Sequence, residues 1–135
     1  MKDITIACPP NSWPNDFAGC LAIGVTKAHE NESLWLVFHV NQGVVVLVSG
    51  LLLEGEEMPP EVERLEPIIH ASAEKNIWTM INKDKHKFYN MVANGKLHIG
   101  GDFREFGRLA SHLVRLSEQT GLWTRLDEIV DEVRR

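Results

Sequence analysis

The chain has 135 residues, of which 44% are hydrophobic and 24% charged, and its formal net charge is -5. This length and composition fit one compact domain and exclude a disordered chain or a collagen-like fibre. The acidic balance argues against nucleic acid and anionic lipid headgroups as partners, because neither would find a basic patch. The N-terminus lacks a secretory signal and no apolar run is long enough for an integral membrane segment, so we expect a cytoplasmic protein.

The first part of the chain predicts an arm followed by a sheet. Residues 1–16 hold three of the six prolines and are expected to form a proline-rich N-terminal arm, and residues 17–135 a single domain. Phe17–Thr26 indicates a strand, and Lys27–Ser33 indicates a charged loop.

The strongest strand signal lies in Leu34–Val40 and Val44–Leu53. Both segments are rich in Val, Leu, Phe and Trp, and a short loop that contains Gly43 separates them, which predicts an antiparallel hairpin. The continuous apolar run Val44–Val48 indicates a strand that is covered on both faces, or a strand with one face covered by helices and the other by a partner.

The remainder of the chain alternates between short elements. Glu54–Glu66 predicts an exposed acidic loop with a helical turn at Glu61–Leu65, and Pro67–Ala73 a further strand. A short helix with Ile77, Trp78 and Ile81 on one face comes next, and a second helix over Lys85–Ala93 and a strand over Lys96–Ile99 follow it. Asp102 is the expected N-cap of a helix over Phe103–Glu118. After a break at Gly121, a last helix begins at Leu122.

This order of elements, β-β-β-β-α-α-β-α-α, predicts an α+β fold. Because the strands come first and the helices gather later, we expect a mainly antiparallel sheet of about five strands with helices packed on one side.

The polar residues give no local catalytic motif. Cys8 and Cys20 lie in no CxxC motif and have no nearby histidine partner, which indicates buried free thiols. His39, His70 and His98 fall on predicted strands and could converge on a metal, but hydrogen-bonded or solvated histidines are the preferred interpretation. The sequence therefore indicates no metal site and no cofactor.

The serines and glycines also form no motif for nucleophilic catalysis or phosphate binding. Ser49, Ser72 and Ser111 lie in no nucleophile motif. The pair Gly100–Gly101 precedes a helix, but the carboxylate of Asp102 would repel a phosphate there, so we interpret these glycines as structural.

Large apolar side chains on the short helices could line a cavity beside the sheet, although a tightly packed core would use the same residues. The candidate ligand-binding residues are Trp78, Ile81, Phe88, Met91, Phe106, Leu109 and Leu113.

One string carries a family resemblance. Gly95–Asp102, with the sequence GKLHIGGD, resembles the G-K-L-x-I-x-G-D stretch of the sterol carrier protein 2 family of lipid-binding domains. The resemblance covers about residues 34–118 and implies a lipid or another apolar small molecule held between sheet and helices. This chain departs from the family pattern at both ends, with a proline-rich arm in place of an N-terminal amphipathic helix and an extra helix after Gly121.

Three functions remain open at this point. The first is non-catalytic binding or carriage of a lipid or another long apolar ligand. The second is a homo-oligomeric interaction module, possible as a homodimer, that has a filled core and uses Val44–Leu53 or the last helix as its contact. The third is a metal-dependent enzyme that uses His39, His70 and His98.

Overall fold

The computed structural model describes residues 1–6, 8, 13–84 and 86–135, apart from the side chains of residues 103, 106–110, 113 and 119. The elements are β1 (Lys2–Ile4), β2 (Gly19–His29), β3 (Glu32–Asn41), β4 (Val44–Glu54), α1 (Pro60–Glu63), β5 (Ile69–Glu74), α2 (Lys75–Lys83), α3 (Lys87–Ala93), β6 (His98–Gly101), α4 (Phe103–Thr120) and α5 (Leu126–Arg134).

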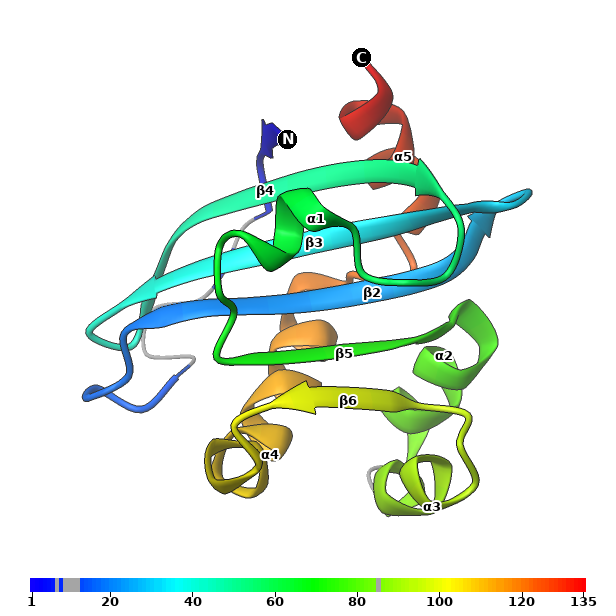
Figure 1. Ribbon diagram of the computed structural model, residues 1–135. Helices are drawn as coiled ribbons and strands as arrows, with labels where there is room; N and C mark the ends of the chain where they lie inside the picture. Colours follow the sequence, from blue (N-terminus) through cyan, green and yellow to red (C-terminus); the bar gives the residue numbers. More distant parts are fainter. Residues whose placement is uncertain (7, 9–12, 85) are drawn as a thin grey trace.

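The strands form one mixed sheet with the order β1-β4-β3-β2-β5-β6. Strands β2, β3 and β4 follow one another as an antiparallel meander, and β5 and β6 extend the sheet beyond β2 (Figure 1). The pairing of β2 with β5 is parallel, whereas every other pairing of described strands is antiparallel. The predicted α+β class with a mainly antiparallel sheet is therefore confirmed.

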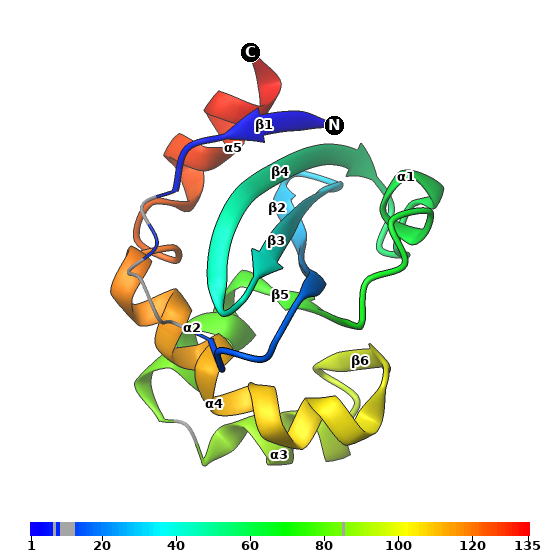
Figure 2. The same ribbon diagram turned by 90° about the vertical axis from the view of Figure 1, so that its left-hand side faces the viewer.

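The main core lies between one face of the sheet, here called the inner face, and helices α2–α5. Period-two alternation sends Leu34, Leu36 and Phe38 of β3 to this face, and all three side chains are almost fully buried. Trp78 of α2 and Ile129 of α5 belong to the same cluster. Figure 2 shows these helices along one side of the curved sheet.

The opposite face of the sheet, here called the outer face, packs against a smaller hydrophobic cluster. Ala22, Trp35 and Val37 point to this face and pack with Val62 of α1. Helix α1 thus lies across the sheet from the other helices (Figure 2). Because both faces of β2 and β3 are covered at this point, these strands read as nearly continuous apolar runs.

Two expectations for the first half of the chain were wrong in detail. The expected charged loop Lys27–Ser33 is mostly strand, since β2 continues to His29 and β3 begins at Glu32. Lys2–Ile4, within the expected arm, forms the edge strand β1 and pairs with Val48–Gly50 of β4. Local sequence gave no signal for β1, because its three residues gain their order from a partner strand.

Among the described residues of this chain, Val44–Val48 is not covered on both faces, and cover of one face by a partner stays a prediction. Val46 is 63% exposed, and Val44 and Leu47 are exposed as well. In the described part of the chain, β1 reaches β4 only from Val48 onward, so the preceding residues stay at an open edge of the sheet.

The helix boundaries follow the predicted capping residues. The side chain of Asp102 accepts a hydrogen bond of 3.0 Å from the backbone N–H of Arg104 at the start of α4. Gly121 ends α4 in the left-handed conformation with φ +64°. The last helix begins at Leu126 and not at Leu122, although Leu122 is buried as expected.

Among the residues that the structure describes, no helix combines the length and the apolar composition that are needed to cross a bilayer.

Gly101 is expected to be essential for stability. Its φ is +101°, and a Cβ there would meet the backbone of Ile68 and lie 3.0 Å from the Cα of Ile69. Gly101→Ala should therefore lower the free energy of unfolding by about 1–3 kcal/mol or more, measured by urea denaturation.

Gly95→Ala is the matched control for this substitution. Gly95 also has a positive φ, of +72°, but a Cβ there would meet nothing within 4 Å. The free energy of unfolding of this variant should fall by only about 1 kcal/mol, because alanine is strained at a positive φ. Equal losses in both variants would contradict a steric role for the contact with Ile68.

Candidate functional site

A cleft with a volume of about 650 Å³ opens on the outer face of the sheet. It lies where β2, β5 and β6 meet the start of α2, and the loop after β4 forms its other wall. Its lining residues are Thr26, Trp35, Glu56, Glu57, Met58, His70, Ser72, Ala73, Glu74, Asn76, Ile77, Gly95, Lys96, His98 and Ile99. The volume falls within the range of about 300–1,000 Å³ that is typical of small-molecule sites.

The floor of the cleft combines an indole ring with two hydroxyl groups. The ring of Trp35 lies flat over Gly24, where a Cβ would come within 2.7 Å of the ring. Thr26 and Ser72, on the neighbouring strands β2 and β5, are 6% and 9% exposed. In the part of the chain that the structure describes, neither hydroxyl has a hydrogen-bonding partner, so both remain available to a ligand.

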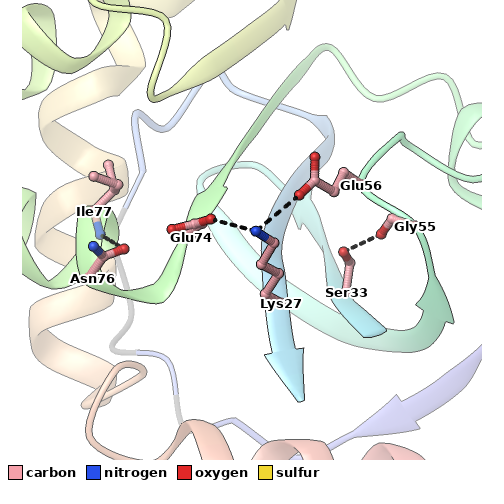
Figure 3. Close-up of polar contacts among 7 residues, drawn as sticks. All are labelled: Lys27, Ser33, Gly55, Glu56, Glu74, Asn76 and Ile77. Atoms are coloured by element: carbon pink, nitrogen blue, oxygen red, sulfur yellow. Dashed lines mark hydrogen bonds and ion pairs between the residues drawn. The ribbon is translucent and has the colours of Figure 1, made fainter. Parts of the chain in front are cut away.

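The loop wall, defined as residues Gly55–Met58, is held to the rest of the cleft by polar contacts (Figure 3). Lys27 Nζ lies 3.3 Å from Glu74 Oε1 on β5 and 3.9 Å from Glu56 Oε1 on the loop wall. The hydroxyl of Ser33 donates to the carbonyl oxygen of Gly55. All three charged side chains are about half exposed, so each ion pair contributes less than about 1 kcal/mol.

Two of the three strand histidines line the cleft. His70 packs against Gly100, where a Cβ would overlap its ring, and His98 lies opposite Ser72 in the β5–β6 ladder. Burial lowers the pKa of His70 below its usual value, and the opposing effect of Glu63 is smaller. His70 is therefore neutral at pH 7 and can both donate and accept a hydrogen bond.

His39 does not join this pair. It lies on the same face of the sheet but on β3, outside the cleft. Among the described residues, no group of three or more His, Cys, Asp or Glu side chains is placed to hold a metal ion. The structure thus brings together two of the three histidines that the metal-enzyme hypothesis needs.

His39 instead contacts Cys20, and this corrects the expectation that neither cysteine has a histidine partner. Cys20 Sγ lies 3.3 Å from His39 Nδ1, because the two residues are directly opposite in the β2–β3 ladder. Both cysteines are free and half-buried, and burial raises the pKa of each thiol. The strand pairing that joins Cys20 to His39 was not visible in local spacing.

The helix residues expected to line a ligand cavity lie on the inner face of the sheet. Trp78, Ile81 and Phe88 are almost fully buried in the main core, and Met91 is partly buried against it. Phe106, Leu109 and Leu113 belong to α4, but their side chains lie outside the described part of the structure.

Trp78 is closely packed by the described residues around it. Its ring stacks on Trp123 with a centroid distance of 5.2 Å, and its Nε1 donates a hydrogen bond of 3.0 Å to the carbonyl oxygen of Gly24. The gap beside Trp78 and Ile81 has a water-accessible volume of about 0 Å³. The role of these helix residues in ligand binding stays a prediction.

The sequence analysis missed most of the cleft, although two signals were present. His70, Ser72 and Glu74 alternate along β5 and therefore share a face of the sheet. Within the GKLHIGGD string, Gly95, Lys96, His98 and Ile99 line the cleft. The position of this string beside the cleft depends on the β5–β6 pairing, which local sequence does not reveal.

Comparisons with known proteins support the fold. No family model and no curated protein matches the sequence. The fold is similar to the solution structure of a conserved hypothetical protein from Thermus thermophilus, described as possibly a sterol carrier protein. The two chains share 17% identity over 78% of this chain and 72% of the other, with a TM-score of 0.52.

Two further solved structures are similar over comparable lengths. A crystal structure of sterol carrier protein 2 is 14% identical over 81% of this chain and 78% of its own, with a TM-score of 0.47. The apo form of sterol carrier protein 2 from Yarrowia lipolytica is 15% identical over 72% and 67%, with a TM-score of 0.42. The likeness to the Thermus protein establishes a fold like that of sterol carrier protein 2, as the GKLHIGGD string suggested.

Cys20 is expected to be a poor nucleophile at neutral pH, because burial raises its pKa and keeps it protonated. In a Cys8→Ser variant, alkylation of Cys20 by iodoacetamide should be slower at pH 7 than alkylation of glutathione and should accelerate as the pH rises. A rate at pH 7 equal to or above that of glutathione would contradict this and would show that His39 activates the thiol.

Proposed function

We propose that the protein binds a lipid or another apolar small molecule without catalysing a reaction, and that the ligand occupies the cleft on the outer face of the sheet. The observation that carries this proposal is a cleft of about 650 Å³ on the outer face of the sheet, which is lined by apolar side chains and by two hydroxyl groups. The description of the Thermus protein as possibly a sterol carrier protein supports the same ligand class. The proposal includes the expected cytoplasmic location and requires no cofactor.

The apolar part of the cleft suits an alkyl chain. Trp35 of β3 and Met58 of the loop wall contribute outer-face apolar side chains, and Ile77 and Ile99 line the cleft while they also pack against the main core. Burial of each methylene group against such a surface contributes about 0.8 kcal/mol before ordering costs are subtracted. Affinity should therefore rise with chain length until the cleft is full.

A displacement assay with a fluorescent fatty-acid analogue tests this proposal. Each added methylene should tighten the binding of a straight-chain competitor by up to about fourfold, and native mass spectrometry should detect one bound ligand per chain. Met58→Ser should weaken binding by about tenfold or more, since Met58 lines the cleft from the loop wall and packs with the outer-face cluster.

Phe88→Ala is the control that distinguishes the cleft from the interior of the domain. Phe88 is buried in the main core, so its loss should lower the free energy of unfolding by about 3–5 kcal/mol and leave affinity per folded molecule unchanged. Weaker binding in Phe88→Ala with normal binding in Met58→Ser would place the ligand between sheet and helices. A protein that takes up no lipid at all would overturn the proposal.

A second candidate function is self-association, and the open edge of β4 favours it. Val44, Val46 and Leu47 are exposed at an edge of β4 that has no partner strand among the described residues, which is a surface that sheet proteins generally protect. A second copy could pair along this edge and cover the three side chains.

Light scattering of the wild type and of Val46→Lys tests this second candidate. Self-association through β4 predicts a dimer for the wild type and a monomer for the variant, because a lysine at a strand edge blocks pairing. A monomeric wild type at high protein concentration would remove this candidate and leave ligand binding untouched.

A further inference from the structure

The buried floor of the cleft offers hydrogen bonds but little means of neutralising a charge. Thr26 and Ser72 are more than nine-tenths buried, and both line the cleft without a partner in the described residues. A ligand head that fills the cleft would have to satisfy these hydroxyls, because an unpaired buried polar group is costly. Uncharged His70 provides a third polar contact on the same strand as Ser72.

The rim of the cleft carries more negative than positive charge. Glu56, Glu57 and Glu74 line it, and Lys96 is the lining residue of opposite charge among those described. Lys27 offsets part of this charge through its contacts with Glu56 and Glu74. Because Lys27 is already engaged between two carboxylates, its ammonium group is poorly placed to pair with an anionic ligand.

We propose that the cleft selects amphiphiles with an uncharged, hydrogen-bonding head group, such as an alcohol or an amide, over anionic amphiphiles with the same chain. This inference rests on the proposed function and specifies the ligand class of the same site. The hydroxyls of Thr26 and Ser72 bind the head group, the rim carboxylates oppose an anion, and the apolar side chains hold the chain.

A matched pair of ligands tests the selection directly. Decanol and decanoate have the same chain length and differ in the charge of the head group at pH 7.5. Isothermal titration calorimetry at submicellar concentration should give an affinity for decanol that is about 10-fold or more above that for decanoate. An affinity for decanoate equal to or above that for decanol would overturn the inference while leaving the proposed function intact.

Two substitutions in the floor test the role of the hydroxyls. Thr26→Val and Ser72→Ala should each weaken decanol binding by about 5-fold to 30-fold, because each removes one partner of the head group. Ser49→Ala is the matched control, since Ser49 is also a buried serine on the outer face but lies on β4 outside the cleft. Unchanged decanol affinity in both floor variants would overturn the inference.

Glu57→Gln tests the role of the rim. Removal of this carboxylate should narrow the difference between decanol and decanoate, whereas Glu118→Gln, an exposed position on α4 away from the cleft, should leave it unchanged. Thermal denaturation of every variant verifies that the protein is folded. If neither ligand binds the folded wild type, the proposed function fails together with this inference, and that outcome is distinct from the loss of selectivity alone.

Discussion

The need to cover both faces of a sheet governs this structure. Helices α2–α5 cover the inner face, whereas the outer face is covered, among the described residues, by α1 and the segment around it. A single helical turn with Val62 as its buried residue is too small to reach from β3 to β6. The part of the outer face that α1 leaves open is the cleft, so the candidate site is a direct consequence of unequal cover on the two faces of the sheet.

Much of the fold could be predicted because its signals are local. The β3–β4 hairpin, the N-cap at Asp102 and the helix end at Gly121 each follow from residues within a few positions of one another. The edge strand β1 and the parallel β2–β5 pairing depend on contacts between distant segments. No local pattern encodes such pairings, and the sequence predicted about five strands because it missed β1, whereas the described residues form six.

The candidate site was harder to predict than the fold for the same reason. Ser72 and Thr26 are unremarkable polar residues in apolar strands until the β2–β5 register places them on one floor. Trp78 and Phe88 have the composition expected of a ligand cavity and are also buried in the main core, so their residue type alone does not distinguish cavity lining from core packing. Composition indicates which residues are apolar, whereas the space that remains between them depends on packing.

The floor and the loop wall of the cleft differ in how firmly they are held in place. The floor lies on strands whose backbone is fixed by ladders on both sides, whereas the loop wall is fastened by solvent-exposed ion pairs at Lys27 and by the contact between Ser33 and Gly55. Opening the loop wall therefore costs far less free energy than distorting the floor. For the proposed ligand, we therefore expect exchange rates to depend on the loop wall and equilibrium preference on the strands, so that substitutions in different segments change residence time and selectivity independently.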